Sequence, residues 1–143
     1  MVLREIMTSP VIRISPQESV AVAARTLTHY NIGILPVCGS DGRMHGVLTD
    51  RDIVTRCLAA GRNPVATKVR EVMTVSVVAA TPETDAVLAA KVMGSRQIRR
   101  LPVVEREKLC GIVSIGDLAT VDEMTYDAGD ALAEISFNVS NRK

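Results

Sequence analysis

The sequence contains an internal repeat, and this feature constrains the fold more than any other. The segment LREIMT at residues 3–8 returns 66 positions later as VREVMT at 69–74. The phrase GVLTDRD at 46–52 returns as GIVSIGD at 111–117, and both copies run from a glycine through two apolar residues and a hydroxyl to an aspartate. Two further segments recur in the same order: 14–27 as 80–93, and 34–37 as 100–103. A period of this size indicates two copies of one structural unit that pack together to bury a shared core.

Each copy predicts the same order of elements: strand, helix, strand, strand and helix. Residues 11–14 mix apolar and charged side chains as a strand does. The first helix is expected to start after Ser19 in one copy and after Asp85 in the other, because both residue types are strong helix N-caps. The segments ILPVC at 34–38 and HGVLT at 45–49 predict two further strands. A second helix follows, which a glycine terminates.

The first helix of each copy carries a stripe of apolar, mostly small residues. The stripe consists of Val20, Ala23, Ala24 and Leu27 in the first copy, and of Ala86, Ala89, Ala90 and Met93 in the second. Such spacing is typical of a helix that packs on a core. One unit with about three strands could hardly bury both faces of its sheet alone. The sequence therefore predicts an α/β (α+β) fold of two stacked βαββα units flanked by helices, with repeats at 1–62 and 63–120, and a short helix and polar tail at 121–143.

Composition narrows the class of protein. With 47% hydrophobic and 23% charged residues, the chain is typical of a soluble globular domain. No apolar run approaches the ~18 residues of a membrane helix, and the start of the chain lacks the apolar region of a secretory signal, so we expect a cytoplasmic protein without a membrane segment. A net charge of +1 and few aromatic residues argue against nucleic-acid binding, which uses a basic excess or aromatic platforms.

Cysteine and histidine patterns indicate neither a metal site nor an active site. Cys38, Cys57 and Cys110 form no CxxC pair, and their odd number without a signal peptide indicates reduced thiols. A metal site built from Cys38 with His29 and His45 matches no ligand spacing, so no metal is expected. Neither histidine lies in a repeated phrase, and no phosphate-loop or nucleophile motif is present. We therefore expect no catalytic residue and no enzyme activity.

The chain resembles the cystathionine-β-synthase (CBS) domain, whose tandem pair is called a Bateman module. The resemblance is carried by the two phrases, the two LPV segments and the REIMT and REVMT openings. The resemblance covers residues 1 to about 120. It implies two clefts between the repeats, which commonly bind an adenosine compound: AMP, ADP, ATP or S-adenosylmethionine. Such a compound would be a regulatory ligand, and the resemblance implies no required cofactor.

The local chemistry of the phrases suits such a ligand. Thr49 and Ser114 stand where a strand ends and a helix begins, and the N–H groups of a helix start suit a phosphate. Asp52 and Asp117 follow one turn later, and an ionised carboxylate can accept hydrogen bonds from both hydroxyls of a ribose. The same spacing of hydroxyl and acid is also a helix-capping box with no ligand present.

The resemblance also implies residues around the adenine and the phosphate. Around the adenine these come from the segment at the start of each LPV strand and from the turn near the first strand, while arginines are phosphate candidates. The positions are Ser15, Gly33, Ile34, Leu35, Pro36 and Arg51 in the first repeat, and Thr81, Arg99, Arg100, Leu101 and Pro102 in the second. The second phrase has Gly116 where the first has Arg51. The clefts are therefore expected to differ in charge, with tighter binding at Ser114 and Asp117.

These features predict a regulatory module that binds a ligand and signals through a change of geometry, acting on a partner protein in trans or as a homodimer. The expected dimer surface is an apolar helical stripe: Ile53, Val54, Cys57 and Leu58, with Leu118 in the copy. The alternative is a stress-associated CBS protein with empty clefts, acting through protein–protein contacts or the redox chemistry of a cysteine, with Cys38 as the candidate. The sequence identifies neither the ligand nor the partner.

Overall fold

The computed structural model describes residues 1–140, with side chains described up to residue 137. The chain forms two compact units. Unit 1 contains residues 1–11, residues 78–106 and the chain from 110 onward, whereas unit 2 contains residues 12–77 and 107–109. Each unit is built mainly from one repeat, but the opening segment of each repeat lies in the unit of the other.

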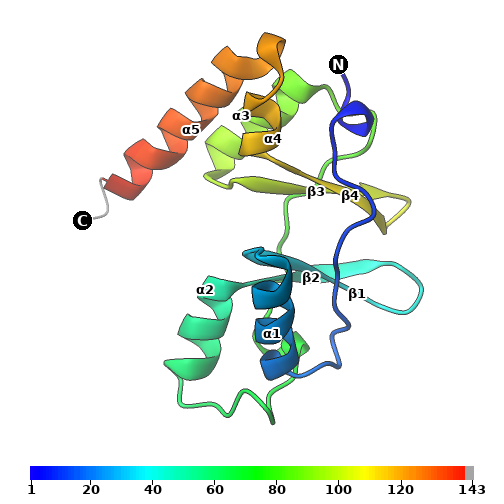
Figure 1. The fold of residues 1–143 in the computed structure, drawn as a ribbon, viewed down its shortest axis with the longest axis vertical. Helices are drawn as coiled ribbons and strands as arrows, with labels where there is room; N and C mark the ends of the chain where they lie inside the picture. Colours follow the sequence, from blue (N-terminus) through cyan, green and yellow to red (C-terminus); the bar gives the residue numbers. More distant parts are fainter. Residues whose placement is uncertain (141–143) are drawn as a thin grey trace. The chain divides into compact units, whose positions relative to one another are not determined.

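Unit 2 is formed by the first repeat. Its elements are α1 (Val20–Tyr30), β1 (Ile34–Cys38), β2 (Met44–Thr49), α2 (Asp50–Asp52), the π-helical η2 (Ile53–Leu58) and the 3-10 turn η3 (Val69–Glu71). β1 and β2 pair antiparallel, and Ile34 lies opposite Thr49. α1 and α2 lie on the same side of this hairpin (Figure 1). The core of the unit includes Val20 and Leu27 from α1 and Leu48 from β2.

Unit 1 is formed by the second repeat and the segment beyond it. Its elements are η1 (Leu3–Glu5), α3 (Ala86–Arg96), β3 (Arg100–Glu105), β4 (Lys108–Ser114), α4 (Ile115–Ala119), η4 (Asp122–Met124) and α5 (Thr125–Ser140). The first two residues of β4 belong to unit 2. α3, α4 and α5 lie on one side of the β3–β4 hairpin (Figure 1). Ala128, Ala131 and Ile135 form the buried face of α5. Among the described residues no helix is long and apolar enough to cross a membrane.

Both first helices begin where the sequence predicts. The Ser19 hydroxyl accepts a hydrogen bond from Val22 N before α1, and the Asp85 carboxylate accepts one from Val87 N before α3. The predicted apolar stripes are confirmed, since seven of their eight residues are buried and Ala24 is partly buried against the core. The predicted mixed α/β fold is therefore confirmed, and the structure has two small antiparallel sheets of two strands each with flanking helices.

The opening segments complete the units. In unit 1, Leu3 N donates to Thr84 O and the Leu3 side chain is fully buried. In unit 2, Val69 N donates to Glu18 O, and Val69 is likewise fully buried. Because each opening segment supplies a buried side chain to the other repeat's unit, neither repeat has a complete core on its own.

Some local predictions were wrong. Residues 11–14 do not form a strand: Ile14 makes a single parallel bridge to Val37. Pro10 and Pro16 flank this segment, and proline has no N–H to donate to a strand ladder. The helix predicted at AGDALAEIS is longer than expected and spans the whole of α5. The end of the predicted polar tail, residues 141–143, lies outside the described residues.

The apolar stripe predicted for a dimer surface divides into two parts. Ile53 and Cys57 are buried in the core of unit 2, whereas Val54 and Leu58 are 55% and 54% exposed. Leu118 is fully buried in unit 1, so the prediction that it belongs to an exposed stripe was wrong. The winding of η2 thus leaves one apolar pair on the surface, at Val54 and Leu58.

Candidate functional site

In the first repeat the phrase forms a reciprocal capping box. Thr49 Oγ1 accepts a hydrogen bond from Asp52 N at 3.1 Å, and Asp52 Oδ2 accepts one from Thr49 N at 3.0 Å. The other two N–H groups of α2 also have partners. Asp50 N donates to Gly33 O at 3.2 Å, and Arg51 N donates to the Asp50 carboxylate at 2.8 Å. All three N–H groups of the first turn are therefore bonded within the chain.

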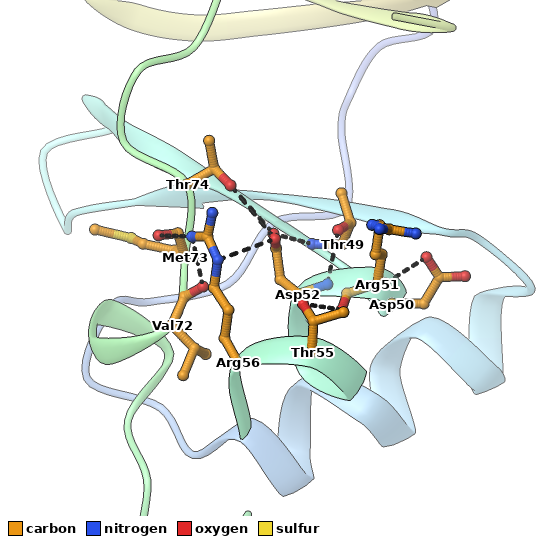
Figure 2. A network of polar contacts seen from close by, with 9 residues as sticks. All are labelled: Thr49, Asp50, Arg51, Asp52, Thr55, Arg56, Val72, Met73 and Thr74. Carbon is orange, nitrogen blue, oxygen red and sulfur yellow. Dashed lines mark hydrogen bonds and ion pairs between the residues drawn. The ribbon is translucent and has the colours of Figure 1, made fainter. Parts of the chain in front are cut away.

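The Asp52 carboxylate is enclosed by other side chains of unit 2. Figure 2 shows Thr74 and Arg56 approaching it, with Thr74 Oγ1 3.4 Å from both carboxylate oxygens and Arg56 Nε 3.8 Å from Oδ1. The Arg56 guanidinium also donates to the carbonyls of Val72 and Met73, at 3.3 and 3.1 Å. Only 11% of the Asp52 side chain is exposed. A ligand hydroxyl would have to compete with these groups.

In the second repeat the same capping box has fewer neighbours. Ser114 Oγ accepts from Asp117 N at 2.9 Å, and Asp117 Oδ2 accepts from Ser114 N at 2.8 Å. Ile115 N donates to Arg99 O. Within residues 1–140, no hydrogen bond engages the Gly116 N–H, and no side chain bonds to Asp117 Oδ1. Asp117 is partly exposed, and its second oxygen makes no hydrogen bond to another described side chain.

The difference follows from three sequence positions. Ile115 replaces Asp50, so this position offers no carboxylate to the next N–H group. Val121 replaces Arg56, so this position supplies no guanidinium to the aspartate. Thr8 corresponds to Thr74 but makes no hydrogen bond to Asp117 in the described structure. Asp50, Arg56 and Thr74 were not among the predicted site residues. Only Arg56 could have been found, because its position four residues after Asp52 favours an ion pair on a helix.

The other residues predicted in the first repeat all lie in unit 2. Gly33 is joined to the phrase by its carbonyl, and Ile34 pairs with Thr49 in the hairpin. Pro36 O accepts from Ile14 N, so Ser15 follows a residue bonded to β1. Arg51 is exposed on α2. The predicted set thus borders one region of the unit, around the end of β2 and the edge of β1.

The residues predicted in the second repeat are arranged in the same way in unit 1. Arg99 is joined to the phrase through its carbonyl, and Arg100 begins β3; both arginines are exposed. Pro102 O accepts from Ala80 N, so Thr81 follows a residue bonded to β3. Thr81 Oγ1 contacts the Thr84 hydroxyl at 3.1 Å. Arg99, whose carbonyl contacts the phrase, and its neighbour Arg100 therefore both have exposed side chains.

The three cysteine thiols are buried or partly buried. Burial raises the pKa of the Cys38 thiol, although Arg13 acts in the opposite direction, and burial also raises the pKa of Cys110. All three cysteines are free, and Cys57 is fully buried. A raised pKa lowers the thiolate fraction at neutral pH, and the thiolate is the reactive form. No group of three or more potential metal ligands occurs among the described residues.

We expect the Cys38 and Cys110 thiols to react slowly with a thiol-specific disulfide reagent at pH 7, and faster only as the pH rises toward their raised pKa values. Absorbance of the released chromophore measures this rate, with the urea-unfolded protein as the control for full reactivity. A fast reaction of Cys38 in the folded protein would contradict this expectation and favour the cysteine-based alternative.

Comparison with known proteins establishes the family. A family model described as the CBS domain matches residues 3–59 and 69–123. The chain belongs to the CBS domain family. A CBS domain-containing protein of Bacillus subtilis, YhcV, is 40% identical over 134 residues, which cover 94% of each chain. The chain is therefore a CBS domain pair, and such pairs form a family of regulatory modules.

Two solved CBS structures resemble the fold. The structure of Hypoxic Response Protein I, with two coordinated zinc ions, matches with a TM-score of 0.79 and 36% identity, covering 85% of this chain and 98% of that one. Among the curated relatives, Hypoxic response protein 1 of Mycobacterium tuberculosis is 38% identical over 116 residues, which cover 81% of each chain. The CBS pair of protein MJ0100, in complex with 5′-methylthioadenosine and S-adenosyl-L-methionine, matches with a TM-score of 0.74 and 28% identity, covering 83% of this CBS pair and 93% of that chain.

Proposed function

We propose that this CBS pair is a regulatory module without catalytic activity of its own that binds an adenosine-containing ligand through Ser114 and Asp117. The observation that carries the proposal is the partly exposed Asp117 carboxylate, whose Oδ1 makes no bond to any other described side chain. An ionised carboxylate accepts hydrogen bonds only, so it suits the two hydroxyl donors of a ribose. The complex of the MJ0100 pair with two adenosine compounds supports this ligand class.

Two arginines at the start of β3 favour a phosphorylated ligand. Arg99 and Arg100 are exposed, and Arg99 O contacts the first residue of α4. Guanidinium groups bind phosphate through paired N–H donors. We therefore expect AMP, ADP or ATP to bind more tightly than uncharged 5′-methylthioadenosine. S-adenosylmethionine carries a positive sulfonium group and is expected to bind less tightly than the nucleotides.

A thermal-shift screen against these five compounds tests the proposal. A ligand that binds only the folded state stabilises it by RT ln(1 + [L]/Kd), about 2.7 kcal/mol at a hundredfold excess over Kd. We expect at least one adenosine compound to raise the melting temperature, while guanosine monophosphate serves as the control for nonspecific anion binding. No shift with any of them at millimolar concentration would contradict the proposal.

The proposed signal is a change of conformation that a partner protein or a dimer mate detects. A ligand produces such a signal only if it binds one of two conformations more tightly than the other. The three free cysteines fit a cytoplasmic location, because that compartment keeps thiols reduced. The raised pKa values of the Cys38 and Cys110 thiols weigh against the redox alternative built on Cys38.

We also propose that the chain forms a homodimer through η2. Val54 and Leu58 are exposed one turn apart, and burying the exposed half of both side chains contributes about 1.5 to 3 kcal/mol per chain. Light scattering at micromolar concentration is expected to give about twice the 15.4 kDa of one chain.

Replacing both residues in the variant Val54→Lys/Leu58→Lys should give the single-chain mass with little change in stability, because neither side chain belongs to the core. Leu88→Lys, which alters an exposed leucine of α3, is the matched control and should leave the mass unchanged. A wild-type mass near 15 kDa would contradict the dimer.

A further inference from the structure

The phrase of the first repeat differs from that of the second in how completely its polar groups are bonded within the chain. A nucleotide bound at such a phrase needs hydrogen-bond acceptors for its ribose hydroxyls and donors or positive charge for its phosphate. In unit 2 the chain's own side chains contact both kinds of group (Figure 2). We infer that Asp50, Arg56 and Thr74 keep the Thr49–Asp52 phrase closed to adenosine ligands, so that only the second repeat binds one.

Two side chains occupy the acceptor atoms of the Asp52 carboxylate. Thr74 Oγ1 lies 3.4 Å from each oxygen of Asp52, and Arg56 Nε lies 3.8 Å from Oδ1. These groups stand in the place of two ribose hydroxyls, since both contact the acceptor atoms that the hydroxyls would use. The carbonyls of Val72 and Met73 hold the Arg56 guanidinium in position. A ribose must therefore displace a side chain that is bonded at three points.

The second step concerns the phosphate. The Asp50 carboxylate accepts a hydrogen bond from Arg51 N at 2.8 Å, which removes a donor and adds a negative charge at the start of α2. The Asp50 carboxylate repels a phosphate that approaches the start of α2, because both groups are negatively charged. In the second repeat, apolar Ile115 stands at this position and leaves the Gly116 N–H without a partner among the described residues.

The three positions thus account for the predicted inequality of the repeats. Thr49 and Asp52 form the same capping box as Ser114 and Asp117. These four residues therefore cannot explain a difference in ligand binding between the two repeats. Asp50 and Arg56 have apolar counterparts in the second repeat, Ile115 and Val121. Exchanging these two residues should therefore convert the first phrase to the open form of the second.

This inference rests on the proposed function, and titration calorimetry with AMP tests it. Wild type should bind one AMP per chain, and the exchange variant Asp50→Ile/Arg56→Val should bind two. Thr55→Val is the matched control: the Thr55 hydroxyl lies near the same helix start and donates to Arg51 O rather than to Asp52, so this variant should still bind one. Two AMP per wild-type chain, or still one in the folded exchange variant, would overturn the inference.

A ligand-free measurement separates failure of the inference from failure of the proposed function. By amide hydrogen exchange, Arg51 should exchange about fivefold more slowly than Gly116 after correction for intrinsic rates, as a hydrogen bond contributing about 1 kcal/mol implies. Asp50→Ile should remove this difference. Equal exchange in wild type would overturn the closed first phrase whatever binds elsewhere. The expected difference with no AMP binding to wild type would support the closed phrase and refute the proposed function alone.

Discussion

Replacing Gly46 by alanine is expected to destabilise the protein by about 2 kcal/mol or more, as forced overpacking typically does. A Cβ at this position would collide with the carbonyl oxygen of Thr74. This oxygen belongs to the backbone, so it can move aside only if the chain itself shifts. Thr74 is fixed there by two hydrogen bonds with Val47, one in each direction. The glycine that opens the first phrase is therefore required by the close approach of the segment 69–74.

The equivalent change, Gly111→Ala, is expected to cost less than half as much. Its Cβ would meet atoms of the Met7 side chain, and Met7 is partly exposed and flexible enough to turn away. Urea unfolding of both variants by linear extrapolation measures the two losses. Equal losses, or a larger loss for Gly111→Ala, would show that the contacts at Thr74 and Met7 do not set the requirement for glycine.

Replacing Asp117 by alanine is expected to weaken AMP binding by about 10- to 150-fold. Hydrogen bonds that involve a charged partner contribute about 1.5–3 kcal/mol, and each 1.4 kcal/mol is a factor of ten in affinity. Asp52→Ala should have a smaller effect, because Asp52 is enclosed by Arg56 and Thr74. Titration calorimetry on wild type and both variants compares these losses.

The conservative variant Asp117→Asn controls for folding, because its side-chain oxygen can still accept from Ser114 N and preserve the capping box. It should retain the wild-type circular dichroism spectrum while losing most of the affinity that Asp117→Ala loses. Equal losses in the Asp52 and Asp117 variants would refute the ranking of the repeats. Unchanged affinity in both would refute the participation of either phrase.

Sequence periodicity predicts the elements of this fold well where side-chain burial determines them. The N-caps Ser19 and Asp85 and the apolar stripes of α1 and α3 are local signals, and the structure confirms them. The error at residues 11–14 arose because apolar content alone does not reveal whether a partner strand is available for pairing. In this segment, the structure shows one bridge to β1, between Ile14 and Val37.

The exchange of opening segments could not be predicted from the repeat. Both copies carry the same REIMT-like motif, so Leu3 and Val69 have the same local environment in sequence. Which repeat each of them packs against depends on contacts between residues far apart along the chain, such as Leu3 N with Thr84 O. Periodicity contains no information on such long-range pairings.

For the candidate site, the sequence predicts which residues gather in each unit but not how they are bonded. Thr49 and Asp52 match Ser114 and Asp117 in type and spacing, and the matching predicts similar phrases. The differences arise from Asp50, Arg56 and Thr74, of which Thr74 lies 22 positions from Asp52. A contact at that separation becomes visible only in the folded chain.

Amide chemical shifts of the folded protein, followed by heteronuclear NMR during titration with AMP, test the central claim most directly. The claim is that an adenosine ligand binds at the phrase of the second repeat, through the open carboxylate of Asp117. The expected result is that the largest shifts fall on Ser114, Gly116 and Asp117, with little change at Thr49 and Asp52. Largest shifts at Thr49 and Asp52, or no shifts at either phrase at saturating AMP, would contradict it.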